Sequence, residues 1–580
     1  MKTFNELKQN AKKDFSKFSK VKVALLGDSS TQFLVHALRG AGYEYCLNLE
    51  IWEADYNQIE TNVFDQESEL YRFCPEVVII FHSSAMLLRK FNQKRPESYP
   101  LFADDHMENL QQLFARLIGT LNAKIIYYNF NEINDAVFGN FGNKSSSSFL
   151  FQLRKINYEI MQFSALNGQF FVCDLSTIQN DAGRRSFFHP SIYIQTDMVL
   201  SLDVLPAVAY RTNDLISAMQ GVVKKCIVLD LDNTIWGGII GDDGIENIQI
   251  GSLGIGKAFT EFQYWVKKLK NRGVIVCVCS KNTEDVAKEP FLKHPDMVLR
   301  LDDISVFVAN WENKVDNLHY IQQVLNIGFD SMVFLDDNPF ERTMVREQIA
   351  GITVPELPED PANYLEILYN LNLFETISFS EEDTKRTDLY KSDAERKMLK
   401  EHFGNEQEYL KSMGMTSKVE PFNKFNIPRV AQLSQRSNQF NLRTMRYTEG
   451  DIVALSNSEK HFSFTFTLDD RFGSNGLVCV VLLMKEDADT VFIDSLFMSC
   501  RVLKRTMENF VLNILVSAMK DKGFRYFKGE YIATHKNVLV QNLYQGLGFI
   551  EKMGYWYLSV NDYVQKETYI TSEQQQKHIT

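Results

Sequence analysis

The stretch IVLDLDNTIWGG, residues 227–238, decides the fold of the middle of this chain. Its apolar start predicts a strand that is buried on both faces. Two carboxylates, Asp230 and Asp232, follow at once, and Thr234 comes two residues later. Ligands of open α/β sheets bind at the carboxyl ends of strands. Because two acidic groups are costly there without a compensating cation or shared proton, the stretch predicts a site for a hard divalent ion.

Three more segments place polar residues where they fit the same site. A strand over VIVCVCS ends at Ser280, a hydroxyl donor for a phosphoryl oxygen. The segment WENK ends at Lys314, a point charge for phosphate and for a carboxylate nucleophile. The strand of SMVFLDD ends at Asp336 and Asp337, which are candidate metal ligands. One such segment is often only a polar strand end, but the ordered set favours magnesium-dependent phosphoryl transfer.

In order and in position, these segments resemble the four motifs of the haloacid-dehalogenase (HAD) superfamily. The resemblance implies that Asp230 attacks phosphorus in line and forms an aspartyl-phosphate. It also implies that Asp232 protonates the leaving oxygen and then deprotonates the hydrolytic water. The expected catalytic residues are Asp230, Asp232, Ser280 and Lys314, the expected substrate-binding residues Thr234 and Asn282, and the expected Mg²⁺ ligands Asp230, Asp232 (through its backbone carbonyl), Asp336 and Asp337.

The residues around these motifs resemble a narrower family, the FkbH-like proteins. The likeness covers roughly residues 220–560 and is carried by LDLDNTIWGGIIGDDG, SKNTEDV, ANWENK, LDDNPFER, VPELPEDPANY, RSNQFNLRT and MSCRVLKR. It implies an enzyme of polyketide or polysaccharide biosynthesis that takes the acyl phosphate 1,3-bisphosphoglycerate and removes phosphate. Such an enzyme delivers the glyceryl unit to an acyl carrier protein as a thioester. The short gap after the first motif leaves no room for a large cap domain, so the site is expected to be open.

The last third of the chain predicts an α+β domain that resembles the GNAT acyltransferases. Its strand–turn–helix, IDSLFMSCRVLKRTMENFVLNIL, lies where such proteins hold a phosphopantetheine arm or CoA with amides at a helix N-terminus. The usual pattern R/Q-x-x-G-x-G/A begins with Arg501, but Lys504 and Thr506 occupy both glycine positions. These side chains add bulk where glycine lets the backbone approach phosphate. A working acyl-transfer site and a degenerate one therefore both stay open.

Two further residues of this domain are candidate acyl-transfer groups. Cys500 either holds an acyl group as a thioester or is a small apolar residue at a strand end. Tyr544, in NLYQGLGF, occupies the place of a tyrosine that often serves as an acid in GNAT proteins.

The segment LLGDSST resembles the first block of the SGNH hydrolases, which implies that Ser29 is a nucleophile in a flavodoxin-like α/β domain. The strand VVIIFHSS, however, is not followed by GxND, and Asp174 and His189 do not have the DxxH spacing. Asp28 and Ser29 can equally form an N-cap pair for the helix that follows. An esterase triad and a degenerate SGNH-like domain that binds a partner are both open interpretations.

The chain as a whole is expected to be a multidomain α/β protein, because short apolar strands alternate with helical periods. Between the second and third domains we expect a solvated, charged helical connector. The predicted order is an SGNH/flavodoxin-like domain (1–210), a HAD Rossmann-like domain with a minimal cap (220–378), the connector (379–412) and a GNAT-like α+β domain (413–570).

The composition of the chain limits which binding partners and which cellular compartment are expected. The 580 residues carry a formal net charge of −12, which argues against nucleic acid or an anionic membrane as the main partner. The eight cysteines show no CxxC…CxxC metal spacing. No apolar run is long enough for membrane insertion, and the amphipathic start lacks a secretion signal. The expected location is a reducing cytoplasm, and the expected partners are a phosphorylated small molecule and a carrier protein.

Two alternatives compete with this interpretation. One is a stand-alone phosphatase, or a polysaccharide acyl-modification enzyme, whose end domains are degenerate. The other is a non-catalytic assembly scaffold. The intact set of Asp230, Asp232, Lys314 and Asp336 argues against a scaffold for the middle domain.

Overall fold

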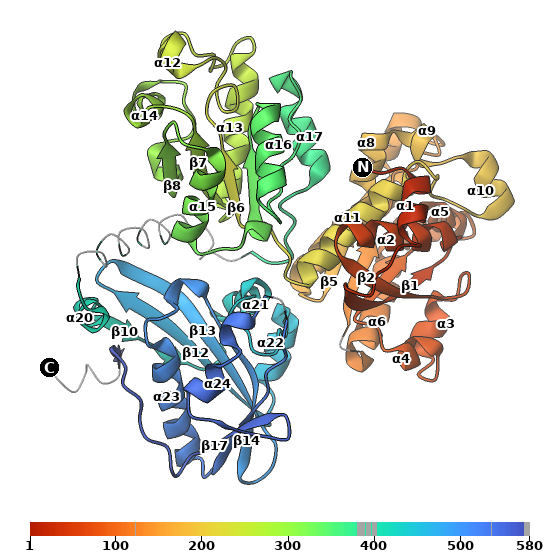
Figure 1. Cartoon of the computed structure of the whole chain (residues 1–580). Helices are drawn as coiled ribbons and strands as arrows, with labels where there is room; N and C mark the ends of the chain where they lie inside the picture. The colour runs from red at the N-terminus through yellow and green to blue at the C-terminus, as the bar shows by residue number, and fades with distance from the viewer. Residues whose placement is uncertain are drawn as a thin grey trace. The chain divides into compact units, whose positions relative to one another are not determined.

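The computed structural model describes residues 1–573 except Asn122, 380–388, 390–391, 393–395, 397–398, 400–402 and His535. The chain forms two compact units, Met1–Met219 and Gln220–Thr580. The described residues build three β-sheets, one in the first unit and two in the second (Figure 1). Each sheet packs against its own cluster of buried apolar side chains. Within these residues, every helix is too short or too polar to cross a bilayer.

The first unit is built on a five-stranded sheet in the order β2-β1-β3-β4-β5, and all four strand pairs are parallel. The central strand β3 is buried along its whole length, as expected for a parallel sheet with helices on both faces. The strands are β1 (Ser19–Gly27), β2 (Leu47–Glu53), β3 (Val77–Phe81), β4 (Lys124–Tyr128) and β5 (Phe170–Cys173). The helices are α1 (Phe4–Asn10), α2 (Gln32–Glu44), α3 (Ile59–Phe64), α4 (Glu69–Phe73), α5 (Ser84–Asn92), η1 (Pro96–Leu101), α6 (Phe102–Thr120), η2 (Gly139–Lys144), α7 (Phe149–Leu166), α8 (Leu175–Ala182), α9 (Arg184–Phe187), α10 (Pro190–Thr196) and α11 (Leu205–Met219).

The N-cap role considered for Asp28 and Ser29 is wrong. Helix α2 begins at Gln32, its N-cap is Thr31, and no side chain caps it. The carboxylate of Asp28 instead accepts a hydrogen bond of 2.9 Å from the backbone N–H of Ser83, at the end of the neighbouring strand β3. Asp28 therefore ties two strand ends together, a long-range contact that local sequence does not encode.

The second unit begins with a four-stranded parallel sheet in the order β8-β7-β6-β9. Strands β6, β7 and β9 are buried at every residue, because one apolar cluster covers each face of the sheet. The strands are β6 (Cys226–Leu229), β7 (Ile275–Ser280), β8 (Val306–Ala309) and β9 (Met332–Leu335). The helices are α12 (Ile240–Asp243), α13 (Gly256–Asn271), α14 (Glu284–Lys293), η3 (Leu301–Asp303), α15 (Lys314–Leu325), η4 (Phe329–Ser331), α16 (Pro339–Gln348), η5 (Pro361–Asn363) and α17 (Tyr364–Leu371).

A mostly antiparallel sheet of nine strands follows, in the order β16-β17-β15-β14-β13-β12-β10-β18 with β11 beside β12. Only the pairs β14–β15 and β10–β18 are parallel among its described strands. The strands are β10 (Met415–Ser417), β11 (Val419–Glu420), β12 (His461–Asp470), β13 (Gly473–Lys485), β14 (Thr490–Met498), β15 (Tyr526–Gly529), β16 (Ile550–Lys552), β17 (Tyr555–Ser559) and β18 (Ile570–Ser572). The helices are α20 (Glu406–Ser412), α21 (Ile427–Arg436), α22 (Glu449–Ser456), η6 (Cys500–Val502), α23 (Met507–Asp521), η7 (Val538–Val540) and α24 (Leu543–Gly546).

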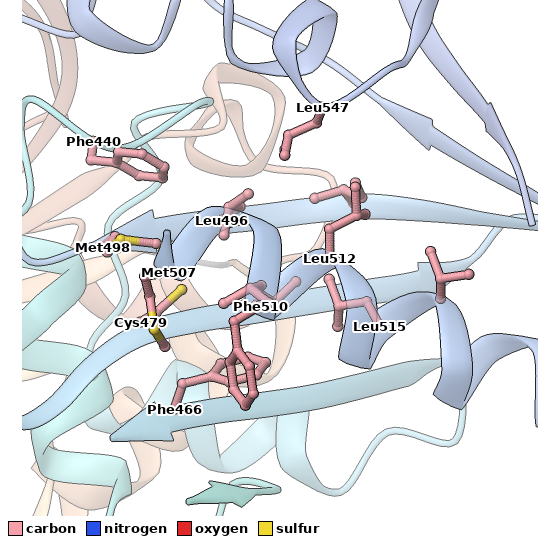
Figure 2. Packing of buried hydrophobic residues seen from close by; sticks show 14 of the residues in the cluster. Phe440, Phe466, Cys479, Leu496, Met498, Met507, Phe510, Leu512, Leu515 and Leu547 are labelled. Atoms are coloured by element: carbon pink, nitrogen blue, oxygen red, sulfur yellow. The ribbon is translucent and has the colours of Figure 1, made fainter. Parts of the chain in front are cut away.

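Helix α23 supplies the main cover of one face of this sheet (Figure 2). Figure 2 shows Met507 and Phe510 of the helix close to Phe466 and Cys479 of the sheet. All four side chains are at most 4% exposed. Burial of such side chains contributes roughly 1.5–3 kcal/mol each, so the packing of α23 on this face stabilises the domain.

One expectation for this region is wrong. The connector is not fully solvated, because Arg396 is 2% exposed and donates to Asp470 through Nε at 2.9 Å and Nη2 at 2.8 Å. Leu399 and Phe403 pack against the core of the same domain. Most of the other residues between 380 and 402 lie outside the described part of the chain.

Candidate active site

The register of two parallel strands brings the acidic motifs together. Strands β6 and β9 pair with Leu229 opposite Leu335, so the residues that follow them, Asp230 and Asp336, lie side by side at the carboxyl edge of the sheet. Carboxylate oxygens of Asp230, Asp336 and Asp337 all lie within 4.8 Å of one another. Among the described residues this is the sole cluster of three or more metal-ligand side chains.

A buried lysine lies between two of these carboxylates. The Nζ of Lys314 is 2.9 Å from Oδ2 of Asp230 and 2.6 Å from Oδ2 of Asp336. The lysine side chain is 3% exposed and lies at the first position of α15, whose N-cap is Asn313. One ammonium therefore contacts two of the three carboxylates, and the cluster keeps an excess of negative charge.

The pKa values of the cluster reflect this excess. Burial, and then the neighbouring charge of Asp230, raise the pKa of Asp336 to about 7 and that of Asp337 to about 6. Burial lowers the pKa of Lys314, but Asp230 and Asp336 more than compensate, so its pKa lies above the usual range. The Oδ1 atom of Asp230 is buried and has no hydrogen-bond partner. A hard divalent cation satisfies both the excess charge and this oxygen, so the residues fit Mg²⁺.

Magnesium is expected to stabilise the protein more at about pH 8 than at about pH 5, because it binds deprotonated carboxylates. The raised pKa values of Asp336 and Asp337 mean that the folded, metal-free protein binds more protons than the unfolded chain between about pH 4 and pH 7. These two groups therefore lower the free energy of unfolding of the metal-free protein as the pH rises through that window. Thermal melts with magnesium or with a chelator measure the difference. An equal gain from magnesium at both pH values contradicts the assignment, and Asp336→Asn is expected to reduce the gain.

The carboxylate of Asp232 is not part of the cluster. Its Oδ1 accepts hydrogen bonds from the indole Nε1 of Trp236 at 2.9 Å and from the backbone N–H of Ile240 at 3.0 Å. Its Oδ2 accepts one from Nδ2 of Asn282 at 2.8 Å. These three donors fix the carboxylate in one orientation.

Replacing Trp236 by phenylalanine is expected to lower kcat by roughly tenfold, the effect of losing one hydrogen bond to a charged group. The phenyl ring fills only part of the buried place beside Phe291, so a lower melting temperature is expected as well. Steady-state phosphatase assays across pH provide the measurement. If Trp236 only fills space, the pH profile of kcat stays unchanged. If Trp236 positions Asp232, the arm of this profile that depends on the ionisation of Asp232 shifts. Trp311→Phe, at a side chain that is 74% exposed, is the matched control.

The other candidate residues of the middle sheet lie around the same edge. Ser280 is 1% exposed, and its Oγ accepts a hydrogen bond of 3.3 Å from Nδ2 of Asn282. Asn282 therefore links Ser280 to Asp232. Thr234 is fully buried, and its Oγ1 accepts a hydrogen bond of 3.2 Å from the backbone N–H of Asp337. The threonine thus holds the loop after β9 in place.

Two residues that support the site had no role assigned from the sequence. The guanidinium of Arg342 donates from Nη1 to the backbone carbonyls of Asp336 at 2.8 Å and Asp337 at 2.6 Å. The hydroxyl of Tyr364 donates to the backbone carbonyl of Asn233 at 3.0 Å, and Asn233 has a left-handed φ of 53°. Both side chains lie within the segments LDDNPFER and VPELPEDPANY, so their presence in these motifs was the available signal.

In the first unit, the residues proposed for an esterase triad are not joined by hydrogen bonds. The hydroxyl of Ser29 is buried and has no hydrogen-bond partner among the described residues. The carboxylate of Asp174 instead accepts the backbone N–H of Thr177 at 3.1 Å and caps α8. His189 is the N-cap residue of α10.

In the last domain, two residues of the loop before α23 have the left-handed backbone conformation that glycine usually adopts, although neither is a glycine. Lys504 and Thr506 have φ values of 63° and 61°. Arg501 donates from Nε to Oγ of Ser499 at 3.3 Å. Tyr544 is 2% exposed, its hydroxyl has no hydrogen-bond partner, and burial raises its pKa. The side chain of Cys500 lies outside the described part of the structure.

Comparison with known proteins supports the architecture around these sites. Residues 22–217 match the family model described as FkbH, N-terminal domain. The solved N-terminal part of protein BF1531 from Bacteroides fragilis, which contains a phosphatase domain complexed with Mg, is 56% identical in sequence. It covers 65% of this chain and 100% of its own, with a TM-score of 0.63. The comparison with curated proteins gave no match.

Two further solved structures are similar to a smaller part of the chain. The ribosomal-protein-S18-alanine N-acetyltransferase from Escherichia coli is 12% identical, with a TM-score of 0.21. It covers 26% of this chain and 99% of its own. The spermidine N-acetyltransferase SpeG from Vibrio cholerae, in complex with CoA and spermine, is 10% identical, with a TM-score of 0.20. It covers 26% of this chain and 96% of its own.

The parallel sheet and the carboxylate cluster at its carboxyl edge make the middle of this chain an α/β domain with a metal-binding type of site. The match to the FkbH N-terminal domain and the 56% identity to the Bacteroides fragilis protein identify the family. The chain belongs to the FkbH-like proteins, as its motifs indicated.

Proposed function

We propose that this protein is a magnesium-dependent phosphatase of the HAD type, coupled to the transfer of a glyceryl unit from an acyl phosphate to an acyl carrier protein. The observation that carries the proposal is the state of Asp230. Lys314 holds one of its carboxylate oxygens, and the other is buried without a partner beside Asp336 and Asp337. The magnesium-bound phosphatase domain of the 56% identical relative supports the same assignment.

In the first step, an oxygen of Asp230 forms a bond to the phosphorus of the substrate's phosphate ester, and the bond from phosphorus to the leaving oxygen breaks. Asp232 gives its proton to that leaving oxygen. Lys314 neutralises Asp230 and lies at the same edge as the phosphoryl group that it stabilises. Magnesium, when bound, withdraws charge from the phosphoryl oxygens, and Asp230, Asp336 and Asp337 would hold it.

In the second step, Asp232 takes a proton from water, and the water oxygen bonds to the phosphorus of the aspartyl-phosphate. The bond from phosphorus to Asp230 breaks, which releases inorganic phosphate and restores the carboxylate. Ser280, held by Asn282, donates a hydrogen bond from its hydroxyl to a phosphoryl oxygen in both steps. The three hydrogen bonds to Asp232 keep its carboxylate in place for the two proton transfers.

For the acyl transfer, the substrate class is an acyl phosphate that also carries a phosphate ester, such as 1,3-bisphosphoglycerate. The sulfur of a phosphopantetheine thiol bonds to the carbonyl carbon, and the bond from that carbon to the phosphate oxygen breaks. Inorganic phosphate leaves, and the thiol proton leaves with it. The left-handed backbone at Lys504 and Thr506 supports a binding loop of the GNAT type in the last domain. The first domain is proposed to be a degenerate SGNH-like domain that binds a partner.

One observation favours the alternative of a stand-alone phosphatase. The segment Phe440–Leu442 hydrogen-bonds to β14, with Met498 N–H donating to the carbonyl of Phe440 at 3.0 Å and Leu442 N–H donating to that of Leu496 at 3.3 Å. The pairing of β14 with β15 ends at Ile493. Beyond Ile493, the edge of β14 therefore pairs with the segment Phe440–Leu442 of the same chain. A ligand that binds alongside a strand would need this edge to be open.

Incubation of the full chain with magnesium, 1,3-bisphosphoglycerate and a phosphopantetheinylated carrier protein tests the proposal. A glyceryl mass gained by the carrier, together with released phosphate, supports the coupled reaction. Phosphate release from simple esters without modification of any carrier supports the stand-alone phosphatase. No phosphate release from any substrate in magnesium supports the scaffold.

A further inference from the structure

The first unit contains a cavity of about 350 Å³, which the proposed phosphatase chemistry does not use. It is lined by Glu60 of α3, by α5 and α6, and by His82, which follows the end of β3. This position is the carboxyl side of a parallel sheet, where α/β proteins bind ligands. Part of its wall is apolar and is formed by Leu87, Phe102, Leu110 and Leu113.

Two histidines in this wall share one buried tyrosine. Nδ1 of His82 lies 3.0 Å from the hydroxyl of Tyr127, and Nε2 of His106 lies 3.3 Å from the same hydroxyl. Tyr127 is fully buried, and His82 is 5% exposed. The remaining ring nitrogens, Nε2 of His82 and Nδ1 of His106, have no hydrogen-bond partner among the described residues.

Because both rings share one tyrosine hydroxyl, their remaining nitrogens have opposite hydrogen-bonding roles. If Tyr127 donates to His82, then His82 carries its proton on Nε2, and His106 must donate Nε2–H to the tyrosine. His106 then presents a lone pair on Nδ1. If Tyr127 donates to His106 instead, the roles of the two histidines are exchanged. In either arrangement of the neutral rings, the pair presents one donor and one acceptor.

The surroundings keep both rings neutral. Burial lowers the pKa of His106 to about 4, and burial together with His106 and Lys90 lowers the pKa of His82 well below its usual value. The charged residues that also line the cavity are near their counterions. Lys90 is 3.9 Å from Glu60, and Lys94 is 3.0 Å from Asp105.

We propose that this cavity binds a small neutral molecule through a hydroxyl or carboxamide group held between His82 and His106, with its apolar part against the leucines and Phe102. Such a group carries both a donor and an acceptor, so it can satisfy both nitrogens. An anion offers acceptors alone, so the ring nitrogen that acts as an acceptor would face a lone pair of the anion. A metal ion is disfavoured, because no third ligand side chain completes a cluster with these histidines in the described part of the chain. The inference is independent of the proposed phosphatase activity.

Saturation-transfer NMR of the full chain, with N-methylacetamide as the neutral probe and acetate as the anionic one, tests this site. N-methylacetamide is expected to show saturation transfer and acetate to show none. Tyr127→Phe removes the shared hydroxyl and keeps the ring, so it should weaken binding of the neutral probe by about tenfold. Phosphate release by the middle domain should be unchanged in this variant.

A second variant does not depend on altering the core. Asn109 is exposed and lines the cavity, so Asn109→Trp should obstruct the mouth and abolish the signal of N-methylacetamide. Glu108→Trp adds the same ring at an exposed residue of α6 that does not line the cavity, and it should keep the signal. Equal saturation of acetate, no saturation of N-methylacetamide, or equal signals from the two tryptophan variants would overturn the proposal.

Discussion

Asp230→Asn is expected to reduce phosphate release by at least about a thousandfold, the scale on which loss of a nucleophile acts. Asparagine keeps the size of the side chain but cannot form the aspartyl-phosphate. The fold should survive, because the change removes one of three clustered carboxylates while Lys314 keeps its contact with Asp336. Phosphate release in magnesium and the melting temperature in a chelator are the two measurements.

The matched control for this variant is Asp316→Asn, at an exposed position in the first turn of α15. It makes the same chemical change two residues from Lys314 without touching the cluster. Activity within twofold or so of the parent is expected for this control. Substantial activity in Asp230→Asn with normal magnesium dependence would remove Asp230 as the nucleophile and with it the proposed mechanism.

Lys314→Met is expected to destabilise the metal-free protein by about 3–5 kcal/mol, because it leaves two buried carboxylates without their cation. Phosphatase activity should be lost as well. Two further effects on stability are expected only if Lys314 balances the charge of the carboxylate cluster. Added magnesium should restore part of the stability, and so should a lower pH, because protonation of Asp336 removes the repulsion. Denaturant titrations with and without magnesium, at two pH values, measure each effect.

Lys257→Met serves as the control, since its side chain is 64% exposed and is paired at 3.6 Å with Glu261. Exposed pairs of this kind contribute about 0–1 kcal/mol, and neither magnesium nor pH should change the outcome. If Lys314→Met is as stable as this control in a chelator, the lysine does not balance the charge of the site.

The middle site was largely predictable because its information is local. Each motif is a short apolar strand followed by polar residues, and parallel pairing places all strand ends of this kind at one edge. The sequence thus indicated that Asp230, Lys314, Asp336 and Asp337 would meet. It could not show that the carboxylate of Asp232 would turn away toward Trp236 and Asn282, because that depends on how two loops pack.

Errors arose where long-range contacts override local patterns. Strand β2, Leu47–Glu53, was not predicted, since its half-buried edge position gives it a mixed pattern. The charged connector was expected to be solvated, yet Arg396 is buried against Asp470 in a partner strand far along the chain. Asp28 was considered a helix cap, but it bonds to Ser83 of another strand end. None of these partners is within reach of a local sequence window.

The loop at Lys504 and Thr506 has an implication for the stability of this domain. A left-handed backbone costs residues with a Cβ atom roughly 1–2 kcal/mol each, and glycine almost nothing. Glycine at either position would therefore relieve this backbone cost, so the two side chains lower the stability of the loop in which they stand.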